Sequence, residues 1–336
     1  MKFLGHFRFI IFKNTIFERM IRYLAIGVII FITWYCTPPH TVSMFNNAVE
    51  LGEALFKDPI LSRDSSLSCA SCHKPDFAFA DTSALSKGHK GQRGLRNTPS
   101  AMNITDHNFY FWDGRAATLE EQALGPIENP AEMNLPLSLA IRRLKRHALY
   151  AKSFYAIYGV APSALNLSQA LADYQRSLET SDTPFDRYMQ NQDSSEFSLS
   201  ARRGLQIFNT KGKCFDCHFG SDFTGNDQFK NIGLYDGKSW NDKGRFEITH
   251  NPKDLGAFKT PGLRNIALTA PYMHNGAFKT LTDVIEYYNT PDKFVSASIG
   301  RDALLQQPLG LSAQEKSDLL AFLISLTDRR FTQKKI

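Results

Sequence analysis

Two short patterns in the sequence place a pair of cysteines directly before a histidine. They are Cys69-Ala-Ser-Cys72-His73 and Cys214-Phe-Asp-Cys217-His218. Cysteines three positions apart lie on one side of a helical turn, where both sulfurs can bond the two vinyl groups of one haem and the next histidine can reach its iron. The chain holds only five cysteines and nine histidines, so chance does not account for two copies. The sequence therefore predicts two covalently attached c-type haems, with His73 and His218 as proximal iron ligands.

The N-terminus has the order of an export leader. Residues 24–36 are apolar and follow Arg19 and Arg22. Roughly 13 apolar residues are short for a membrane-spanning helix, which needs about 20, and suit a signal peptide or a marginal anchor. We therefore expect residues 1–36 to be a signal peptide or an N-terminal membrane anchor of a periplasmic protein, with lipidation of Cys36 as a third alternative. Export and the histidine after each cysteine pair disfavour a zinc ribbon, and a disulfide redox pair is the other alternative.

The net charge excludes some classes of partner. The chain has a formal charge of +6, but residues 1–36 carry five Lys or Arg and one Glu, so the remainder carries +2. A near-neutral chain of 21% charged residues is typical of a mixed, solvated surface. We expect no nucleic-acid partner, and membrane attachment only through the N-terminus.

Helix signals dominate the rest of the chain. Capping boxes at 118–121 and 312–315 each open an amphipathic run. Further helices are expected at 44–56, 137–158, 168–179, 200–209 and 280–289. The irregular stretches 58–117 and 220–275 are long for a protein without a cofactor, and a buried haem would supply the missing core.

The sequence also indicates a duplicated unit. Leu-Gly-Glu-Ala-Leu-Phe (51–56) precedes the first cysteine pattern, and a related segment (203–208) precedes the second. The predicted fold class is mainly α, with two cytochrome c-like helical haem domains and long loops. We place the first domain at 44–190 and the second at 198–330, divided by the polar segment 182–198.

These motifs, taken in order, resemble the bacterial di-haem cytochrome c peroxidase and MauG superfamily over about residues 48–328. The resemblance rests on the two cysteine patterns and on the following segments: Leu-Gly-x-x-Leu-Phe (51–56), Gly88-His89 with Arg96-Asn97, Phe-Trp-Asp-Gly-Arg (111–115), Glu-Gln-Ala (121–123), Glu132-Met133, Thr-Pro-x-Leu-Arg-Asn (260–265) and Tyr-Met-His-Asn-Gly (272–276).

The resemblance implies roles for four residues around the N-terminal haem. Glu132 corresponds to the family's distal acid or base, with Gln122 beside it, and a carboxylate there can move a proton between the two peroxide oxygens. His89 corresponds to a histidine that caps the N-terminal haem iron in many members until its glycine-rich loop moves. Trp112 corresponds to the tryptophan between the haems that helps electrons cross.

The resemblance also implies metal ligands elsewhere. A calcium ion between the domains would take a side-chain oxygen of Asn97 and the backbone carbonyls of Thr269 and Pro271. Classical peroxidases of the family have a methionine ligand in the helix after the His-Asn-Gly motif, where this chain has Tyr288. A tyrosine ligand is the MauG-like pattern and favours ferric iron. A tyrosine that only packs on a helix face, beside Tyr287, is the alternative.

Three functions follow. The first is a di-haem cytochrome c peroxidase that reduces hydrogen peroxide with electrons from a small cytochrome c or copper protein. The second is a MauG-like enzyme that uses peroxide to oxidise a protein or an organic substrate. The third is a non-catalytic di-haem electron carrier. The resemblance further implies a homodimer.

Overall fold

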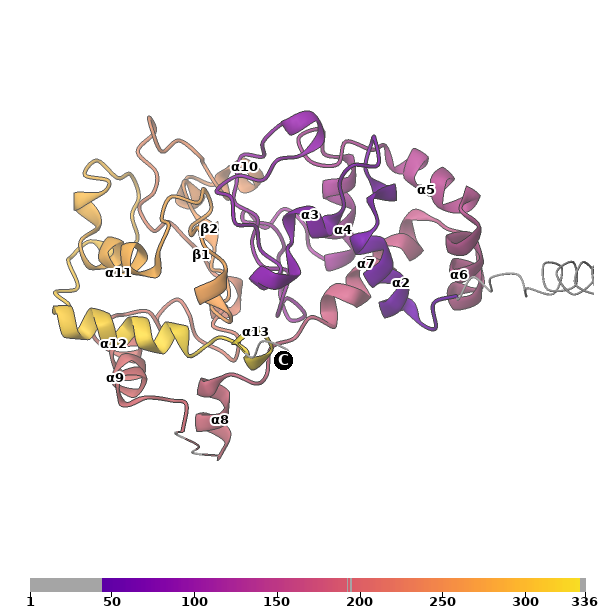
Figure 1. Cartoon of the computed structure of the whole chain (residues 1–336). Coiled ribbons are helices and arrows are strands. Elements are labelled where there is room, and N and C mark those ends of the chain that lie inside the picture. Colours follow the sequence, from indigo (N-terminus) through magenta and orange to yellow (C-terminus); the bar gives the residue numbers. More distant parts are fainter. Residues whose placement is uncertain (1–43, 192, 194, 333–336) are drawn as a thin grey trace, which may run out of the picture. The chain divides into compact units, whose positions relative to one another are not determined.

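The computed structural model describes residues 44–191, 193 and 195–332, so the expected leader and Cys36 lie outside the described residues. Helices dominate the described chain (Figure 1). They are α2 (Ala48–Lys57), α3 (Cys69–Cys72), α4 (Leu119–Glu128), α5 (Leu137–Arg146), α6 (Ala148–Tyr158), α7 (Ala164–Arg176), α8 (Pro184–Asn191), α9 (Leu199–Asn209), α10 (Phe246–Thr249), α11 (Leu281–Asn289), α12 (Ala313–Ile324) and α13 (Arg329–Thr332), with a two-stranded antiparallel pair, β1 (Phe229–Lys230) and β2 (Phe258–Lys259). The mainly α fold class is confirmed. Within the described residues, no helix is both long and apolar enough to cross a bilayer.

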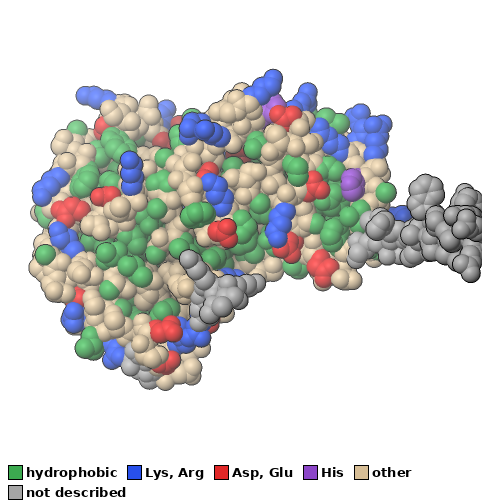
Figure 2. Space-filling view, in the orientation of Figure 1, with side chains coloured by type: hydrophobic (Ala, Val, Ile, Leu, Met, Phe, Trp, Pro, Cys, Tyr) green, Lys and Arg blue, Asp and Glu red, His purple; other side chains and the backbone are tan. Residues whose placement is uncertain are grey.

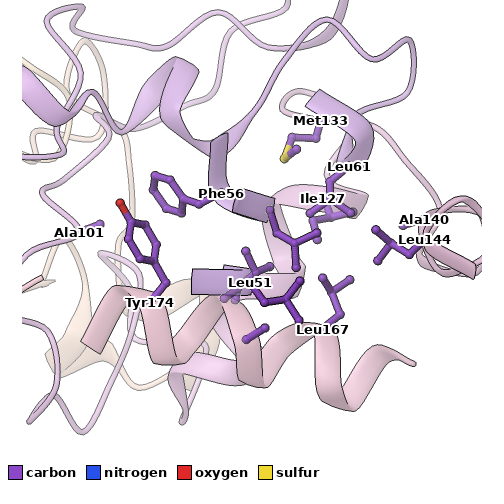
Figure 3. Close-up of a cluster of buried hydrophobic side chains, with 14 of the residues drawn as sticks. Leu51, Phe56, Leu61, Ala101, Ile127, Met133, Ala140, Leu144, Leu167 and Tyr174 are labelled. Carbon is purple, nitrogen blue, oxygen red and sulfur yellow. The ribbon is translucent and has the colours of Figure 1, made fainter. Parts of the chain in front are cut away.

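Helices α2 and α7 form the centre of a first buried cluster (Figures 1 and 3). They approach closely because α2 carries Gly52, where a Cβ atom would lie 1.9 Å from the carbonyl oxygen of Ala170. One turn further along, the Phe56 ring packs edge-on against Tyr174 of α7 with ring centroids 5.2 Å apart. Phe79 also contacts Phe56, with ring centroids 6.1 Å apart. Glycine at the crossing therefore sets the spacing at which these rings meet.

Helices α9 and α12 repeat this arrangement in a second buried cluster. A Cβ atom on Gly204 of α9 would lie 2.0 Å from the carbonyl oxygen of Asp318 in α12. Phe208 then packs edge-on against Phe322, with ring centroids 5.0 Å apart, and Phe223 takes the place that Phe79 has in the first cluster. The duplication expected from the sequence thus extends to the helix crossing and the ring contacts.

The loops that precede α4 and α11 also repeat. An antiparallel bridge joins Tyr110 to Ala116 in the first loop and Tyr272 to Phe278 in the second. Thr118 and Thr280 then accept hydrogen bonds from backbone amides at the start of the two helices. Positions after these two caps can therefore be compared one for one.

Several local expectations are corrected. The predicted helix 137–158 breaks at His147, which ends α5 and caps α6 by accepting a hydrogen bond from the amide of Tyr150. The predicted helix 168–179 begins and ends earlier, as α7, because Ser163 forms its capping box. The box at Ser312 is confirmed, whereas the Glu121 carboxylate accepts from the amide of Ala117 rather than from its own cap residue.

The polar segment proposed as a domain boundary contains a helix. Within 182–198, α8 places Phe185 and Tyr188 against the second buried cluster. Residues from Met44 onward form one compact unit, so the division into two domains stays a prediction. On the face shown in Figure 2, Lys and Arg are interspersed with Asp and Glu, which fits the mixed surface expected from the charge.

Candidate functional site

The first cysteine pattern folds as a single helical turn. α3 spans Cys69 to Cys72, and the backbone amide of His73 donates to the carbonyl oxygen of Cys69 over 2.8 Å. The His73 ring is fixed by its Nδ1 atom, which lies 2.9 Å from the carbonyl oxygen of Phe79. That oxygen can only accept, so the proton sits on Nδ1 and leaves Nε2 with a free lone pair. Burial lowers the pKa of His73, which keeps the ring neutral. A neutral imidazole held in this way is ready to ligate a metal.

The second pattern forms a hydrogen-bonded turn rather than a helix, but its histidine makes the same two contacts. The amide of His218 donates to the carbonyl oxygen of Cys214 over 2.8 Å, and His218 Nδ1 lies 2.8 Å from the carbonyl oxygen of Phe223. Burial also lowers the pKa of His218. Two sites built alike, each with two thiols and one imidazole, fit two haems attached alike.

The thiols do not fit the disulfide redox alternative. All four described cysteines are free. Burial raises the pKa of Cys69 and of Cys214 to about 12 in each case. A redox-active pair needs a thiol with a lowered pKa, because the thiolate is the nucleophile. Partly buried, protonated thiols beside an imidazole are instead suited to permanent attachment.

A cavity of about 980 Å³ opens from the first cysteine pattern. Cys69, Cys72 and His73 line it, as do Gln122 and Glu132. Apolar walls come from residues such as Phe56 and Leu171. Its size and largely apolar lining suit a haem, with a few polar groups positioned over it.

Glu132 has an unusual environment for a carboxylate. Its Oε1 atom accepts a hydrogen bond from the Asn129 amide over 2.7 Å. Burial raises the pKa of Glu132, against the opposing effects of this hydrogen bond and of the Arg115 charge. A raised pKa makes a carboxylate a better proton acceptor, which suits a group that exchanges protons with a substrate. The structure thus brings together Glu132, Gln122 and His73 around one cavity.

His89 lies outside this group. Its ring is buried and its Nδ1 atom lies 3.3 Å from Asp64 Oδ2, without hydrogen-bond geometry. Gly88 lines the cavity and His89 does not. The loop is held by the His89 amide, which donates to the carbonyl oxygen of Glu132 over 2.7 Å. In this conformation the His89 side chain does not cover the His73 site.

Trp112 lies between segments from the two halves of the chain. Its indole N–H donates to the carbonyl oxygen of Asn97 over 2.8 Å, and its own carbonyl oxygen accepts from the amide of Lys259. The Trp112 ring meets His274 edge-on, with ring centroids 6.5 Å apart. The indole lines the His73 cavity and contacts the loop that leads into α11.

The residues expected to bind calcium are partly brought together. The Asn97 amide nitrogen donates to the carbonyl oxygens of Ser83 and Ala84, each over 3.2 Å, which leaves its Oδ1 atom for another partner. The Asn97 backbone amide donates to the carbonyl oxygen of His274, three residues after Pro271. Asn97 therefore lies beside the loop that carries Thr269 and Pro271, where oxygen ligands could converge.

The two neighbouring tyrosines of α11 have different environments. Tyr287 is fully buried and donates its hydroxyl to the carbonyl oxygen of Ile232 over 2.6 Å. Burial raises the pKa of Tyr288, with further contributions from Tyr287 and from the thiols of Cys217 and Cys214. Tyr288 is therefore near the second cysteine pattern.

Sequence reasoning missed several polar residues of the cavity. Asn129, which holds Glu132, follows no motif that we used. His107 and Lys259 line the same cavity and meet at Asp227, which is far from either in sequence. No local spacing pattern signals such a cluster, since each residue comes from a different loop.

Geometry and comparison define the class of protein. Two partly buried cysteine pairs, each with an adjacent imidazole, define a di-haem c-type cytochrome. Residues 46–194 match the family described as di-haem cytochrome c peroxidase. The chain is 34% identical to the cytochrome-c peroxidase IdrP1 of Pseudomonas sp. (strain SCT), over 83% of this chain and 80% of that protein. It is 39% identical to the methylamine utilization protein MauG of Methylophilus methylotrophus, over 82% and 81%.

A solved structure is similar to this chain as well. A MauG-like protein associated with microbial copper homeostasis matches with a TM-score of 0.77 and 32% identity, covering 89% of this chain and 94% of that chain. The chain belongs to the di-haem cytochrome c peroxidase family, which includes the MauG proteins. Membership implies two haem c groups and places the chain among oxidoreductases.

Proposed function

We propose that this protein is a periplasmic di-haem peroxidase that reduces hydrogen peroxide to water with electrons from a small cytochrome c or copper protein. The observation that carries the proposal is the raised pKa of Glu132 in the cavity that contains His73. A plain electron carrier has no use for a proton-exchanging carboxyl group at its haem. The named peroxidases among the relatives support the same class of reaction.

Haem bound at His73 would supply the redox chemistry, and the protein's residues would handle the protons. In this proposal Glu132 accepts a proton from one peroxide oxygen and delivers it to the other, so that the departing oxygen leaves as water. Asn129 holds the Glu132 carboxyl in place, and Gln122 donates a hydrogen bond to the bound peroxide. The apolar walls exclude bulk water from this exchange.

We propose that electrons enter at the haem held by His218 and cross by way of Trp112. The contacts of Trp112 with Asn97 and with the ring of His274 support this route. His89 acts as the gate, and the conformation with His89 beside Asp64 corresponds to the open state. Calcium bound by Asn97, Thr269 and Pro271 would hold the two halves, here taken as the domains 44–190 and 198–330, in register.

A MauG-like oxidation of a protein or organic substrate is the second candidate. It is favoured by Tyr288, whose position near Cys214 and Cys217 suits a ligand to the second haem. A tyrosine ligand stabilises ferric iron, so this haem would not need reduction before peroxide arrives. The protein could then draw both electrons from a substrate at its surface.

Stopped-flow optical spectroscopy of the diferric holoprotein tests the two candidates. The protein is mixed with hydrogen peroxide and then with a reduced small cytochrome c. Peroxide reaction only after one-electron reduction, followed by oxidation of the cytochrome, supports the gated peroxidase. Immediate reaction of the diferric form without cytochrome oxidation supports the MauG-like enzyme, and no reaction in any redox state refutes both.

A further inference from the structure

A cluster of three buried polar residues forms a second polar part of the His73 cavity. His107, Asp227 and Lys259 come from three separate loops, and their side chains are 7%, 1% and 12% exposed, respectively. Asp227 accepts a hydrogen bond from His107 Nδ1, and its Oδ1 atom lies 3.2 Å from Lys259 Nζ. His107 and Lys259 line the cavity that also contains Cys69 and His73. The mechanism proposed above does not use this cluster.

The Lys259 ammonium has more N–H donors than hydrogen-bond acceptors around it. His107 Nδ1 lies near both Asp227 and Lys259 Nζ, but a nitrogen that donates to the carboxylate cannot accept from the ammonium. Lys259 therefore has one acceptor among its described neighbours, Asp227, for three N–H groups. Burial lowers the pKa of Lys259 more than Asp227 raises it. The residues around this ammonium thus compensate its charge only in part.

Other buried cations of the cavity are already satisfied. Arg96 donates to both oxygens of Asp242 and to Asp113. Arg264 likewise donates to both oxygens of Asp186 and to Asp222. Every guanidinium nitrogen of these two residues has a carboxylate partner. Lys259 is therefore the buried cation of this cavity with the greatest capacity to bind a further anion.

A haem attached through its vinyl groups carries two propionates on the part of the ring away from the thioether bonds. With the thioethers at Cys69 and Cys72, these carboxylates must lie among the remaining lining residues. We propose that Lys259, supported by Asp227 and His107, binds a propionate of the haem held by His73 and is a positioning residue that raises this haem's reduction potential. A nearby positive charge raises the potential because it disfavours the extra positive charge of ferric iron. This inference rests on haem attachment, and not on peroxide turnover.

The test compares the holoprotein with Lys259→Met and Lys259→Arg variants by potentiometric titration and resonance Raman spectroscopy. We expect Lys259→Met to lower one of the two midpoint potentials and to shift a propionate bending band. Lys259→Arg, which keeps the charge, should retain most of that potential. The matched control is Lys243→Met, since Lys243 also lines the cavity but is exposed and should move neither potential.

Unchanged potentials and an unchanged propionate band in Lys259→Met holoprotein would overturn the proposal. If that variant fails to accumulate, Asp227→Asn provides the second measurement. Without the Asp227 carboxylate, the Lys259 ammonium interacts with the propionate alone, and the midpoint potential of the same haem should rise. An unchanged midpoint potential in this variant also overturns the proposal. If the variants show these shifts in midpoint potential but the holoprotein does not react with peroxide, the proposed peroxidase function is refuted and the propionate proposal stands.

Discussion

Replacement of Glu132 by glutamine separates the proton-transfer role of this residue from its structural role. Glutamine keeps the size of the side chain, and its amide oxygen can still accept the 2.7 Å hydrogen bond from Asn129. Burial raises the pKa of Glu132 above the ordinary 4.5, so the charged carboxylate is held at a cost to folding. The variant should therefore be at least as stable as the wild type at neutral pH.

The loss of activity should be large by contrast. A positioned proton-transfer group contributes about 10²- to 10⁴-fold, which corresponds to about 2.7–5.4 kcal/mol in the activation free energy. We expect kcat/KM for peroxide to fall by that factor. The wild-type rate should also fall at acidic pH, as Glu132 gains a proton at its raised pKa, and this dependence should vanish in the variant.

Steady-state oxidation of a reduced cytochrome c across pH measures both effects. Glu128→Gln is the matched control, because Glu128 is an exposed carboxylate on α4 that does not line the cavity. A Glu132→Gln protein that keeps kcat/KM within about threefold of the wild type, with the same pH profile, would refute a proton-transfer role of this size.

Three further perturbations test other parts of the argument. Tyr288→Met should raise the midpoint potential of one haem, because a thioether ligand favours ferrous iron relative to a phenolate, and an unchanged potentiometric titration would exclude Tyr288 as a ligand. Gly204→Ala should lower the free energy of unfolding by about 1–3 kcal/mol in denaturant titrations, since its Cβ would lie 2.0 Å from the Asp318 carbonyl oxygen. The Arg203 hydrogen bond holds the pKa of Asp318 at about 2, so this carboxylate stabilises the fold above pH 3.8 and ceases to do so as pH falls through 2. Asp318→Asn should accordingly cost stability at pH 7 and very little near pH 2, whereas equal losses at both pH values would contradict the assignment.

Local patterns predicted the parts of this structure that local geometry determines. In both cysteine patterns the histidine amide bonds the first cysteine's carbonyl oxygen, as expected, because five consecutive residues determine this turn; it is a helix in the first pattern and a turn in the second. The box at Ser312 is equally local, since both of its hydrogen bonds join residues three apart. The end of α5 was missed because His147 caps the next helix with a ring nitrogen, and histidine is not a usual cap residue.

Contacts between distant loops account for what the sequence did not predict. Asp227 meets His107 across 120 residues, and no periodicity connects them. The position of His89 beside Asp64, rather than in the cavity, depends on how its loop packs against the segment of Glu132. These arrangements follow from the packing of the whole chain, which a single sequence does not reveal.

The duplicated frame accounts for the difference between the two sites. Thr118 caps α4 and Thr280 caps α11, so the eighth residue after each cap occupies the same place in its half. That residue is Pro126 in the first half, where it lines the His73 cavity, and Tyr288 in the second. A proline side chain cannot ligate iron, whereas a tyrosine can. In the proposed function, this one difference in a common frame would leave the first iron open to peroxide and would offer the second iron a sixth ligand. Glu132, in the loop that follows α4, lines the same cavity and would supply the proposed proton-exchanging group there.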